Sequence, residues 1–393
     1  MVDHNIEPAH ILVVDDAKVN RMLLTRHLEQ QGHRVSSAEH GKVALEMLAD
    51  MDCDLILLDV DMPEMDGYQT LETLKADTEL RHLPVIMVTS IDDIASTVRC
   101  IEMGAEDYLP KPFNPVLLQA RVGASLEKKR LRDQEQAYLK GLERELEIGR
   151  DIQKGFLPAE LPQVKGWKIA ASLKPAREVA GDFYDAYSLA ADGSVCLVIG
   201  DVCDKGVGAA LFMTLFRSLL RFTMGATDAF GERSPEEKLK YAVTLTNNYI
   251  ENTHGDTGMF ATIFFGLLDP KDGVLTYINA GHERPIILSK DGEQRILTST
   301  GLAVGVMPDW DYKVEQIRMN AGDLLFAFTD GAPEMTDPNG VFFGKDRLLS
   351  LLDCNCHTVA DLIDEINTEL IEHIGSSNQF DDITLMAVQR LEN

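Results

Sequence analysis

Three short runs near the N-terminus, at 11–14, 55–58 and 85–88, are apolar at every position. A strand with one wet face alternates apolar and polar residues, so these runs predict central parallel strands buried on both faces. Apolar residues at helical spacing over 18–30 and 42–49 predict helices between the strands. This alternation predicts a doubly wound α/β domain with a parallel sheet, whose ligand site lies at the carboxyl ends of the strands.

Polar side chains follow these strands at the points where they end. Asp15 and Asp16 follow the first run, Asp59 and Thr89 follow the other two, and Lys111 follows a weaker fifth strand near 106–109. We expect them to converge on one edge of the sheet, where three carboxylates repel one another unless a hard cation such as Mg²⁺ lies between them. The lysine and the hydroxyl suit a phosphoryl group on one aspartate. Helix capping would explain one such aspartate, but not the whole set.

The stretches ILVVDD, LILLDVDMPEMDG, PVIMVTS and DYLPKPF resemble the response-regulator receiver family over residues 8 to about 125. The resemblance implies a flavodoxin-like sheet of five parallel strands. It also implies that a histidine kinase or a phosphotransfer protein donates the phosphoryl group. The resemblance implies that Asp59 is the phosphoacceptor and that Asp15, Asp16, Asp59 and the Asp61 carbonyl bind Mg²⁺. It also implies that Thr89 and Lys111 contact the phosphoryl group. Tyr108 would be the switch aromatic.

The segment 119–157 contains no proline and is rich in Glu, Lys, Arg, Gln and Leu. Its apolar residues approximate a helical stripe that Gly141 and Gly149 interrupt, and we expect the helix to end by Leu157, before Pro158. A solvated helical linker and a dimeric coiled coil explain the pattern about equally well. The two domains that it connects favour the dimer.

The remaining chain contains several strand-like runs joined by Asp-Gly turns, which favour antiparallel hairpins. Long helical stretches interrupt them, and one of these begins at a capping box formed by Ser234 and Glu237. We expect an α+β sandwich. The strands are predicted at 195–199, 261–267, 275–278, 285–288, 324–328 and 383–388, and the helices at 208–224, 235–252 and 359–374.

Four aspartates occupy the ends of these predicted strands or the glycine-containing turns beside them. They are Asp182 in VAGDFYD, Asp201 in IGDVCDKG, Asp330 in FTDGAPE and Asp381 in FDDITL. Four convergent carboxylates without histidine or cysteine suit a binuclear site for Mg²⁺ or Mn²⁺, but not for zinc. Two such ions polarise a phosphoryl oxygen and activate a shared water. Ordinary Asp-Gly turns would explain FTDG alone, but not the ordered set.

These motifs, together with ELEIGRDIQKGFLP, VGAALFM, INAGHERP and LAVGV, resemble the PPM (PP2C-like) phosphatases over about 142–391. The similarity is to the RsbU/SpoIIE branch of bacterial serine/threonine phosphatases. It implies that Asp182, Asp201, Asp330 and Asp381 are metal ligands, with Asp201 bridging both ions and the Val202 carbonyl assisting. Asp185 and Asp382 are weaker candidates that would support the ligands from outside. His282 matches a motif, and we expect it to form a structural hydrogen bond. Asp204 departs from the family, which usually has a glycine or small residue there.

The formal net charge of −27 at pH 7 argues against a nucleic-acid-binding surface, because such surfaces need basic patches. The six cysteines include no CxxC pair, which favours reduced thiols over zinc or disulfides. No apolar run reaches about 18 residues, and the N-terminus lacks the basic and apolar regions of a signal peptide. We therefore expect a cytoplasmic protein that does not bind a membrane or a nucleic acid.

We expect a receiver at 8–125, a helical linker at 126–157 and a phosphatase domain at 158–393. Phosphorylation of Asp59 would switch a metal-dependent phosphatase. The resemblance implies that its substrate is a phosphorylated STAS-type anti-sigma-factor antagonist in a partner-switching pathway. The alternative is a non-catalytic adaptor that uses the phosphatase fold for docking.

Overall fold

The structure, a computed structural model, describes residues 8–90, 94–227, 233–352 and 358–392. The chain divides into two compact units, Met1–Leu142 and Glu143–Asn393. The division falls within helix α5 (Pro115–Phe156). The domain limits predicted after residues 125 and 157 stay predictions. Cys354 and Cys356 lie outside the described residues.

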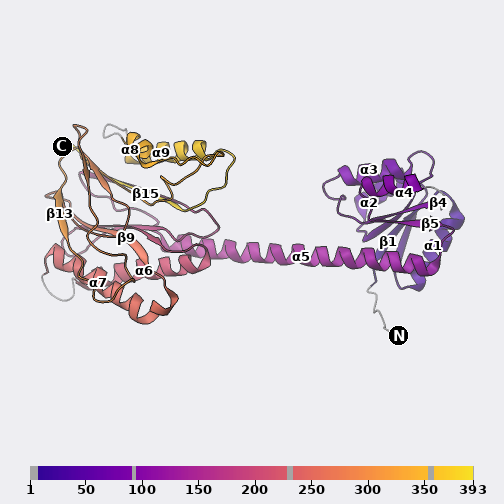
Figure 1. The fold of residues 1–393 in the computed structure, drawn as a ribbon, viewed down its shortest axis with the longest axis horizontal. Coiled ribbons are helices and arrows are strands. Elements are labelled where there is room, and N and C mark those ends of the chain that lie inside the picture. The colour runs from indigo at the N-terminus through magenta and orange to yellow at the C-terminus, as the bar shows by residue number, and fades with distance from the viewer. Residues whose placement is uncertain (1–7, 91–93, 228–232, 353–357, 393) are drawn as a thin grey trace. The chain divides into compact units, whose positions relative to one another are not determined.

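The N-terminal unit alternates strands and helices, as predicted (Figure 1). Its five strands form one sheet in the order β2-β1-β3-β4-β5, and every neighbouring pair is parallel. This confirms the doubly wound α/β fold. The elements are β1 (His10–Val14), α1 (Lys18–Gln30), β2 (Arg34–Ala38), α2 (Gly41–Asp50), β3 (Leu55–Asp59), α3 (Gly67–Ala76), β4 (Val85–Ser90), α4 (Ile94–Glu102) and β5 (Asp107–Lys111).

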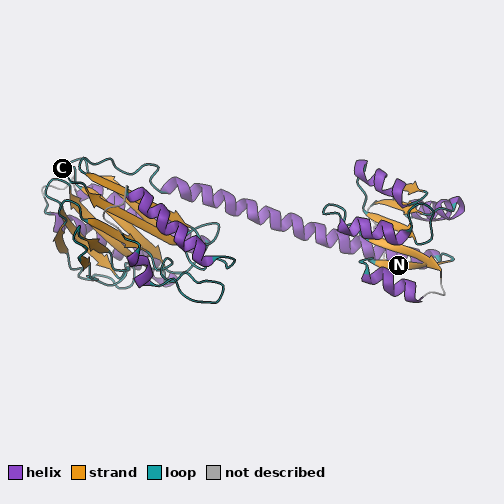
Figure 2. Cartoon of the chain, turned by 90° about the horizontal axis from the view of Figure 1, so that it is seen from above, coloured by secondary structure: helices purple, strands orange, loops and turns teal. Residues whose placement is uncertain are grey.

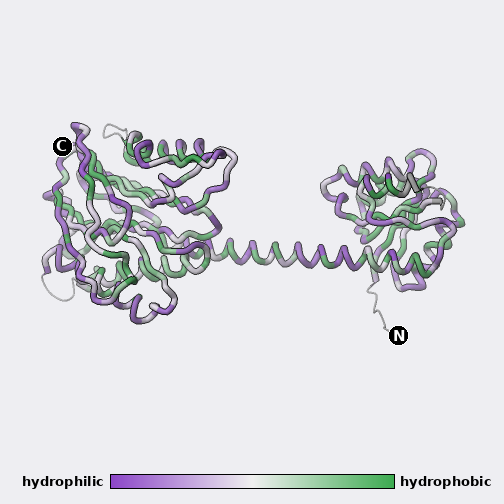
Figure 3. Tube along the Cα trace, viewed as in Figure 1, coloured by the Kyte–Doolittle hydropathy of each residue, from purple (hydrophilic) through white to green (hydrophobic). Residues whose placement is uncertain are grey.

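Helices cover both faces of this sheet, and its central strands contain the apolar runs 11–14, 55–58 and 85–88 (Figure 3). On one face, Leu24 of α1 and Leu118 of α5 pack against β1, β3 and β4. On the other, Leu48 of α2 and Leu71 of α3 pack against the same strands. With both faces covered, the carboxyl ends of the strands remain open to ligands.

Helix α5 ends at Phe156, one residue before the predicted limit of Leu157. Both interrupting glycines, Gly141 and Gly149, lie inside it. Several of its large apolar side chains are exposed, among them Leu131, Tyr138, Leu139, Leu142, Ile148 and Ile152. A dimeric coiled coil would cover such side chains, and dimerisation stays a prediction.

The C-terminal unit contains two antiparallel five-stranded sheets (Figure 2). Their orders are β13-β10-β9-β8-β7 and β12-β11-β14-β15-β6. The strands are β6 (Trp167–Lys174), β7 (Phe183–Ser188), β8 (Val195–Val202), β9 (Ala261–Asp269), β10 (Val274–Ala280), β11 (Ile286–Leu288), β12 (Gln294–Ile296), β13 (Glu315–Arg318), β14 (Leu324–Phe328) and β15 (Ile383–Arg390). The helices are α6 (Val207–Thr227), α7 (Pro235–His254), α8 (Lys345–Ser350) and α9 (Val359–Ile374), with a short 3₁₀ turn, η2 (Gly255–Thr257).

The two sheets pack face to face over a core that contains Leu197, Phe264 and Leu325. Helices α6 and α7 cover the outer face of the β8 sheet, and α9 covers the outer face of the β14 sheet. The α+β sandwich flanked by helices is therefore confirmed. It places the ends of β7, β8, β14 and β15 where loops from both sheets can meet.

Helix α6 is long and apolar enough to cross a membrane, and it alone has this property among the residues that the structure describes. Its buried side chains, including Met213, Phe216 and Leu220, pack into the core beneath the β8 sheet. Its apolar character is therefore explained by packing within the C-terminal unit.

Candidate functional site

Three carboxylates meet at the carboxyl ends of β1 and β3. Asp15 and Asp16 directly follow β1, and Asp59 is the last residue of β3. One oxygen from each of the three lies within 4.8 Å of the others. The Lys111 ammonium, at the end of β5, lies 3.0 Å from Asp15 Oδ2 and 2.7 Å from Asp59 Oδ2. These four side chains therefore meet, as the strand order predicts.

Side chains from α1 hold the two aspartates that follow β1. The Asn20 amide donates to both carboxylate oxygens of Asp15 at 3.1 Å. The Arg21 guanidinium donates to the backbone carbonyls of Asp15 and Asp16. Sequence reasoning missed Asn20 and Arg21, because no pattern distinguishes them from other polar residues in a surface helix.

The carboxyl group of Asp59 is held in an unfavourable environment for its charge. Its pKa is raised to about 6, mainly by burial; Lys111 opposes the shift, and the charge of Asp15 adds to it. A cation among the three carboxylates would relieve this cost. An all-oxygen donor set at this spacing fits Mg²⁺.

The other predicted receiver residues lie at or near the same edge. Thr89 is a buried residue of β4, aligned with Pro110 of β5 beside Lys111. Asp61 is exposed just beyond β3. Tyr108 in β5 is half-buried, and the guanidinium carbon of Arg121 lies 5.5 Å from its ring centroid.

The C-terminal unit brings a second set of aspartates together. Asp182 directly precedes β7, Asp330 lies just after β14, and Asp381 lies just before β15. Asp201 is part of β8, because its pairing with β9 continues through Thr262. Strand β8 therefore extends beyond the apolar run at 195–199, and Asp201 lies at its end, as predicted.

These carboxyl groups are close enough to raise one another's pKa. Burial raises the pKa of Asp182 well above its usual value, and the charge of Asp201 adds to the effect. The pKa of Asp201 is raised to about 7, mainly by burial. The charges of Asp330 and Asp381 contribute to this increase. The pKa of Asp330 is raised by burial and then by Asp381. Asp182 is buried and the other three are half-buried, and like charges gathered in this way are costly unless a cation neutralises them.

The donor set fits hard divalent ions. Among the described residues, three acidic groups within 4.8 Å of one another occur only in the N-terminal unit. A Cβ on Gly181 would lie 3.1 Å from the Val202 carbonyl, so the segment before Asp182 closely approaches that potential ligand. The oxygen donors suit Mg²⁺ or Mn²⁺.

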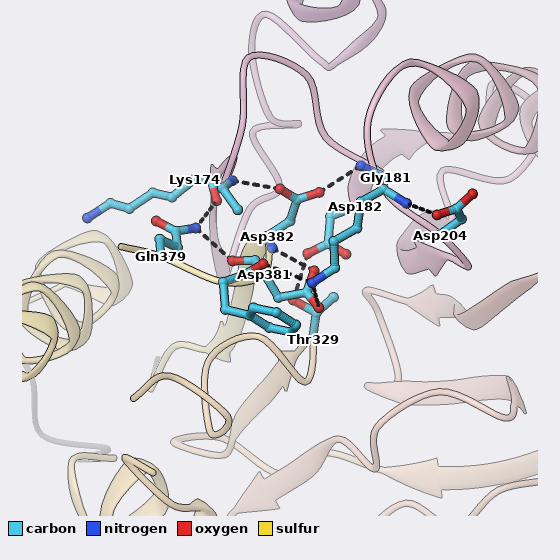
Figure 4. A network of polar contacts seen from close by, with 11 residues as sticks. Lys174, Gly181, Asp182, Asp204, Thr329, Gln379, Asp381 and Asp382 are labelled. Atoms are coloured by element: carbon cyan, nitrogen blue, oxygen red, sulfur yellow. Dashed lines mark hydrogen bonds and ion pairs between the residues drawn. The ribbon is translucent and has the colours of Figure 1, made fainter. Parts of the chain in front are cut away.

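Two threonines and a fifth aspartate support the ligands (Figure 4). The hydroxyls of Thr329 and Thr384 both donate to Asp182 Oδ2 at 2.7 Å. The Asp382 carboxylate accepts the backbone N–H groups of Ala176 and Gly181, each at 2.7 Å. Sequence reasoning missed both threonines, although each lies next to or near a predicted ligand in FTDG or FDDITL.

A lysine lies against one predicted ligand. Lys205 Nζ is 2.8 Å from Asp381 Oδ2, donates to the Phe380 carbonyl at 2.8 Å and lies 3.6 Å from the Phe380 ring centroid. This cation partly compensates the acidic cluster. It was missed because Lys205 and Asp381 are far apart in sequence.

Asp204 and Lys205 belong to the tight turn after β8. Asp204 has a positive φ of 73°, a left-handed conformation that glycine adopts without strain and aspartate tolerates. This explains why the turn can hold an aspartate where the resemblance leads us to expect a small residue. The backbone N–H of Lys205 donates to Asp204 Oδ1 at 2.8 Å.

The weaker candidates occupy structural positions. Asp185 is buried, and its Oδ2 lies 3.0 Å from guanidinium nitrogens of both Arg217 and Arg221. His282 is buried, with Nδ1 3.0 Å from Thr262 Oγ1. Burial lowers the pKa of His282 to about 4, so its ring is neutral at pH 7. This contact is the kind of structural hydrogen bond that we expected for His282.

Comparison with protein families identifies two matches. The family described as Stage II sporulation protein E (SpoIIE) matches residues 191–391, and the response regulator receiver domain matches residues 11–123. The receiver match contains Asp15, Asp16 and Asp59, and the SpoIIE match contains Asp201, Asp330 and Asp381 but begins after Asp182.

Individual proteins give the same picture. Protein IcfG of Synechocystis sp. is 46% identical over 63% of this chain, and the match covers 41% of that protein's length. Phosphoserine phosphatase RsbU of Bacillus subtilis is 28% identical over 65% of this chain and 74% of its own. The SiaA-PP2C domain of Pseudomonas aeruginosa shares the fold, with a TM-score of 0.55 and 22% identity over 65% of this chain and 99% of its own.

Proposed function

The chain belongs to the SpoIIE family and carries a response regulator receiver domain, and from this premise we propose that it is a response regulator with a metal-dependent protein serine/threonine phosphatase as its output. Phosphorylation of Asp59 switches the phosphatase. The observation that carries the proposal is the acidic cluster of Asp182, Asp201, Asp330 and Asp381, in which three carboxyl groups have raised pKa values.

In the receiver, Asp59 is the phosphoacceptor. Asp15, Asp16 and the Asp61 carbonyl join it in holding one Mg²⁺, which fits the three-carboxylate group. Lys111 already contacts Asp59 and is placed to bind an added phosphoryl group together with the Thr89 hydroxyl. Tyr108 is the switch aromatic that responds to this change.

In the phosphatase, Asp182, Asp201, Asp330 and Asp381 hold two Mg²⁺ or Mn²⁺ ions, with the Val202 carbonyl assisting. Bound ions of this kind polarise a phosphoryl oxygen and lower the pKa of a shared water. The role of the protein is to bring these carboxylates together and to orient them. Thr329 and Thr384 orient Asp182, and Asp382 holds the backbone of Gly181 beside it.

The substrate that we propose is a phosphorylated protein, specifically a phosphoserine or phosphothreonine STAS-type anti-sigma-factor antagonist. The similar protein RsbU is named a phosphoserine phosphatase, which supports phosphoserine as the substrate class. A non-catalytic adaptor is disfavoured, because an adaptor gains nothing from a group of partly buried carboxylates that repel one another.

The proposal also covers the partners of the protein, its cellular location and its domain limits. A histidine kinase or a phosphotransfer protein supplies the phosphoryl group, and two copies pair through the linker at 126–157. The protein works in the cytoplasm, with the receiver at 8–125 and the phosphatase at 158–393. The exposed apolar side chains of α5 support the dimer.

The experiment is metal-dependent phosphate release by Asp201→Asn and Asp330→Asn chains. Each substitution removes a ligand charge but keeps the side-chain size, so activity should be lost while the fold is retained. Circular dichroism and thermal unfolding check the fold, and Asp204→Asn serves as the neighbouring control on an exposed carboxylate. Undiminished activity in both ligand variants would contradict the metal site.

A further inference from the structure

A phenylalanine is exposed directly beside one of the proposed metal ligands. Phe380 is 72% exposed, and it precedes Asp381 in the chain. Consecutive Cα atoms lie about 3.8 Å apart, so this ring begins next to the acidic cluster. None of the hydrophobic cores that the described residues form includes Phe380. Its apolar surface therefore contributes little to the stability of the fold.

The ring of Phe380 is held in place despite its exposure. Lys205 Nζ lies 3.6 Å from the ring centroid and donates to the Phe380 carbonyl at 2.8 Å. The same ammonium lies 2.8 Å from Asp381 Oδ2, so the ring and that carboxylate oxygen contact a common cation. The Gln379 amide donates to the carbonyls of Lys174 and Asp381 and so fixes the backbone on both sides of the ring (Figure 4). The ring therefore has a defined position at the edge of the acidic cluster.

A protein substrate has to cover the surface on which this ring lies. Only the Oγ and Cβ atoms separate the phosphorus of a phosphoserine from its Cα atom, so the substrate backbone approaches the acidic cluster to within one short side chain. A folded protein cannot come so close without covering the residue next to Asp381. The apolar surface of Phe380 would then be removed from water, which stabilises the complex.

We propose that Phe380 is a substrate-docking residue of the phosphatase, and that it binds an apolar side chain beside the phosphoserine or phosphothreonine of a folded protein. This inference rests on the proposed function, because it takes Asp381 as a metal ligand and a phosphoprotein as the substrate. Phe380 contacts the protein that carries the phosphoryl group and not the reacting atoms. It therefore contributes to binding, and little entropy is lost because the ring is already held in position.

A purely structural role for the ring would be to hold Lys205. The ion pair with Asp381 and the hydrogen bond to the Phe380 carbonyl already hold this ammonium, and neither needs an aromatic side chain. Phe380→Leu separates the two roles, because leucine keeps apolar surface but lacks the aromatic face that attracts a cation.

The test is the kinetics of phosphate release from a phosphorylated STAS protein by full-length chains. Mn²⁺ is saturating, so that an altered metal affinity does not affect the rates, and the receiver is kept in the phosphorylation state in which the wild type is more active. Phe380→Ala removes the ring, and Phe380→Leu removes only its aromatic character. Phe222→Ala is the matched control, because Phe222 is 74% exposed and lies about 22 Å along α6 from the start of that helix.

We expect Phe380→Ala to raise KM about tenfold with kcat nearly unchanged, the effect of removing an aromatic anchor that binds ground state and transition state equally. Phe380→Leu should raise KM less, and Phe222→Ala should match the wild type. An unchanged KM in Phe380→Ala would show that the substrate does not dock on the ring. A lower kcat with an unchanged KM, or equal defects in Phe380→Leu and Phe380→Ala, would assign the ring to holding Lys205 and would also overturn the inference.

The failure of this inference is distinguishable from failure of the proposed function. If the wild type releases no phosphate from the phosphoprotein with Mn²⁺, then the proposed function is wrong, and the inference falls with it. If the wild type releases phosphate and Phe380→Ala has the same KM, only the docking role is contradicted.

Discussion

Asp182 illustrates how a single residue is prepared for a ligand. Thr329 and Thr384 both donate to its Oδ2, which leaves Oδ1 free of these hydroxyls. The side chain is 2% exposed, and burial raises its pKa despite the two hydrogen bonds. Hydrogen bonds to a carboxylate normally lower its pKa. Here burial and the neighbouring carboxylates raise the pKa by more than the two hydrogen bonds lower it. A cation beside Oδ1 would lower the pKa again.

Phosphorylation of the receiver is a residue-scale prediction. The wild-type chain should acquire an acid-stable, base-labile acyl phosphate from a small phosphodonor, and Asp59→Asn should not. The amide is not a nucleophile for this transfer, although it fits the same space. Phosphate-affinity electrophoresis measures the product, and Asp61→Asn is the control. Equal labelling of wild type and Asp59→Asn would show that the phosphoacceptor is misassigned.

The buried His282 predicts a pH dependence of stability. Its pKa falls to about 4 in the folded state, against about 6.5 in an unfolded chain. Between these values the unfolded state binds a proton that the folded state does not. The contribution of His282 to stability is therefore complete above about pH 6.5 and is lost as the pH falls towards 4.

Urea unfolding of the metal-free chain from pH 7.5 to 4.5 measures this effect. The carboxyl groups with raised pKa values act in the opposite direction, but they do so equally in wild type and in His282→Gln. Relative to the variant, the wild type should lose stability by up to about 1.4 kcal/mol per pH unit below pH 6.5. Parallel pH profiles would contradict a neutral, buried imidazole.

At the residue scale, motifs predicted which aspartates form the two acidic clusters but not the side chains that contact them. Asp15, Asp59 and Asp201 were found because an acid at the end of an apolar run is a local signal. Thr384 and Lys205 were not found, because their significance depends on contacts with residues about 200 and 175 positions away. Such pairs form only when the two sheets pack together, and no local sequence pattern predicts that packing.

At the scale of elements, burial determines which strands can be recognised from the sequence. Strand β3 is buried at every position and was predicted to within one residue. Strands β2 and β13 were missed, since both are edge strands with mostly polar, partly exposed side chains. Edge strands contain few apolar residues, so they cannot be recognised from hydrophobicity alone. They form because they pair with a neighbouring strand.

The capping box of α7 gives an element-scale prediction. The predicted pair is present: the Glu237 N–H donates to Ser234 Oγ at 3.3 Å, and the Ser234 N–H donates to Glu237 Oε2 at 2.9 Å. Ser234→Ala should lower the free energy of unfolding of the C-terminal unit by about 1 kcal/mol. Ser234→Thr retains the cap and should cost less. Urea denaturation measures both, and identical stability of all three chains would show that the cap contributes nothing.

At the scale of the whole molecule, α5 is the covalent route between the two units. It runs without a break from Pro115 to Phe156 and carries receiver core residues in its first turns. A stiff helix can transmit a rotation or a shift in dimer register. Contiguity alone does not demonstrate coupling, so the claim requires a measurement.

Insertions in the linker test this transmission. Two residues inserted next to Gln134 turn the helix by about 200°, whereas seven nearly restore its phase. We expect the two-residue insertion to uncouple phosphatase activity from Asp59 phosphorylation and the seven-residue insertion to preserve most of the coupling. Activity is measured with and without a small phosphodonor. Equal coupling in both insertions would mean that the linker is a passive tether.

The central claim is that receiver phosphorylation controls a metal-dependent phosphatase, and one measurement tests it most directly. Phosphate release from a phosphorylated STAS protein is followed with Mn²⁺, before and after treatment of the receiver with a phosphodonor. We predict that release requires Mn²⁺ and that its rate changes on phosphorylation in the wild type but not in Asp59→Asn. A rate that is the same with and without phosphorylated Asp59 would contradict the account.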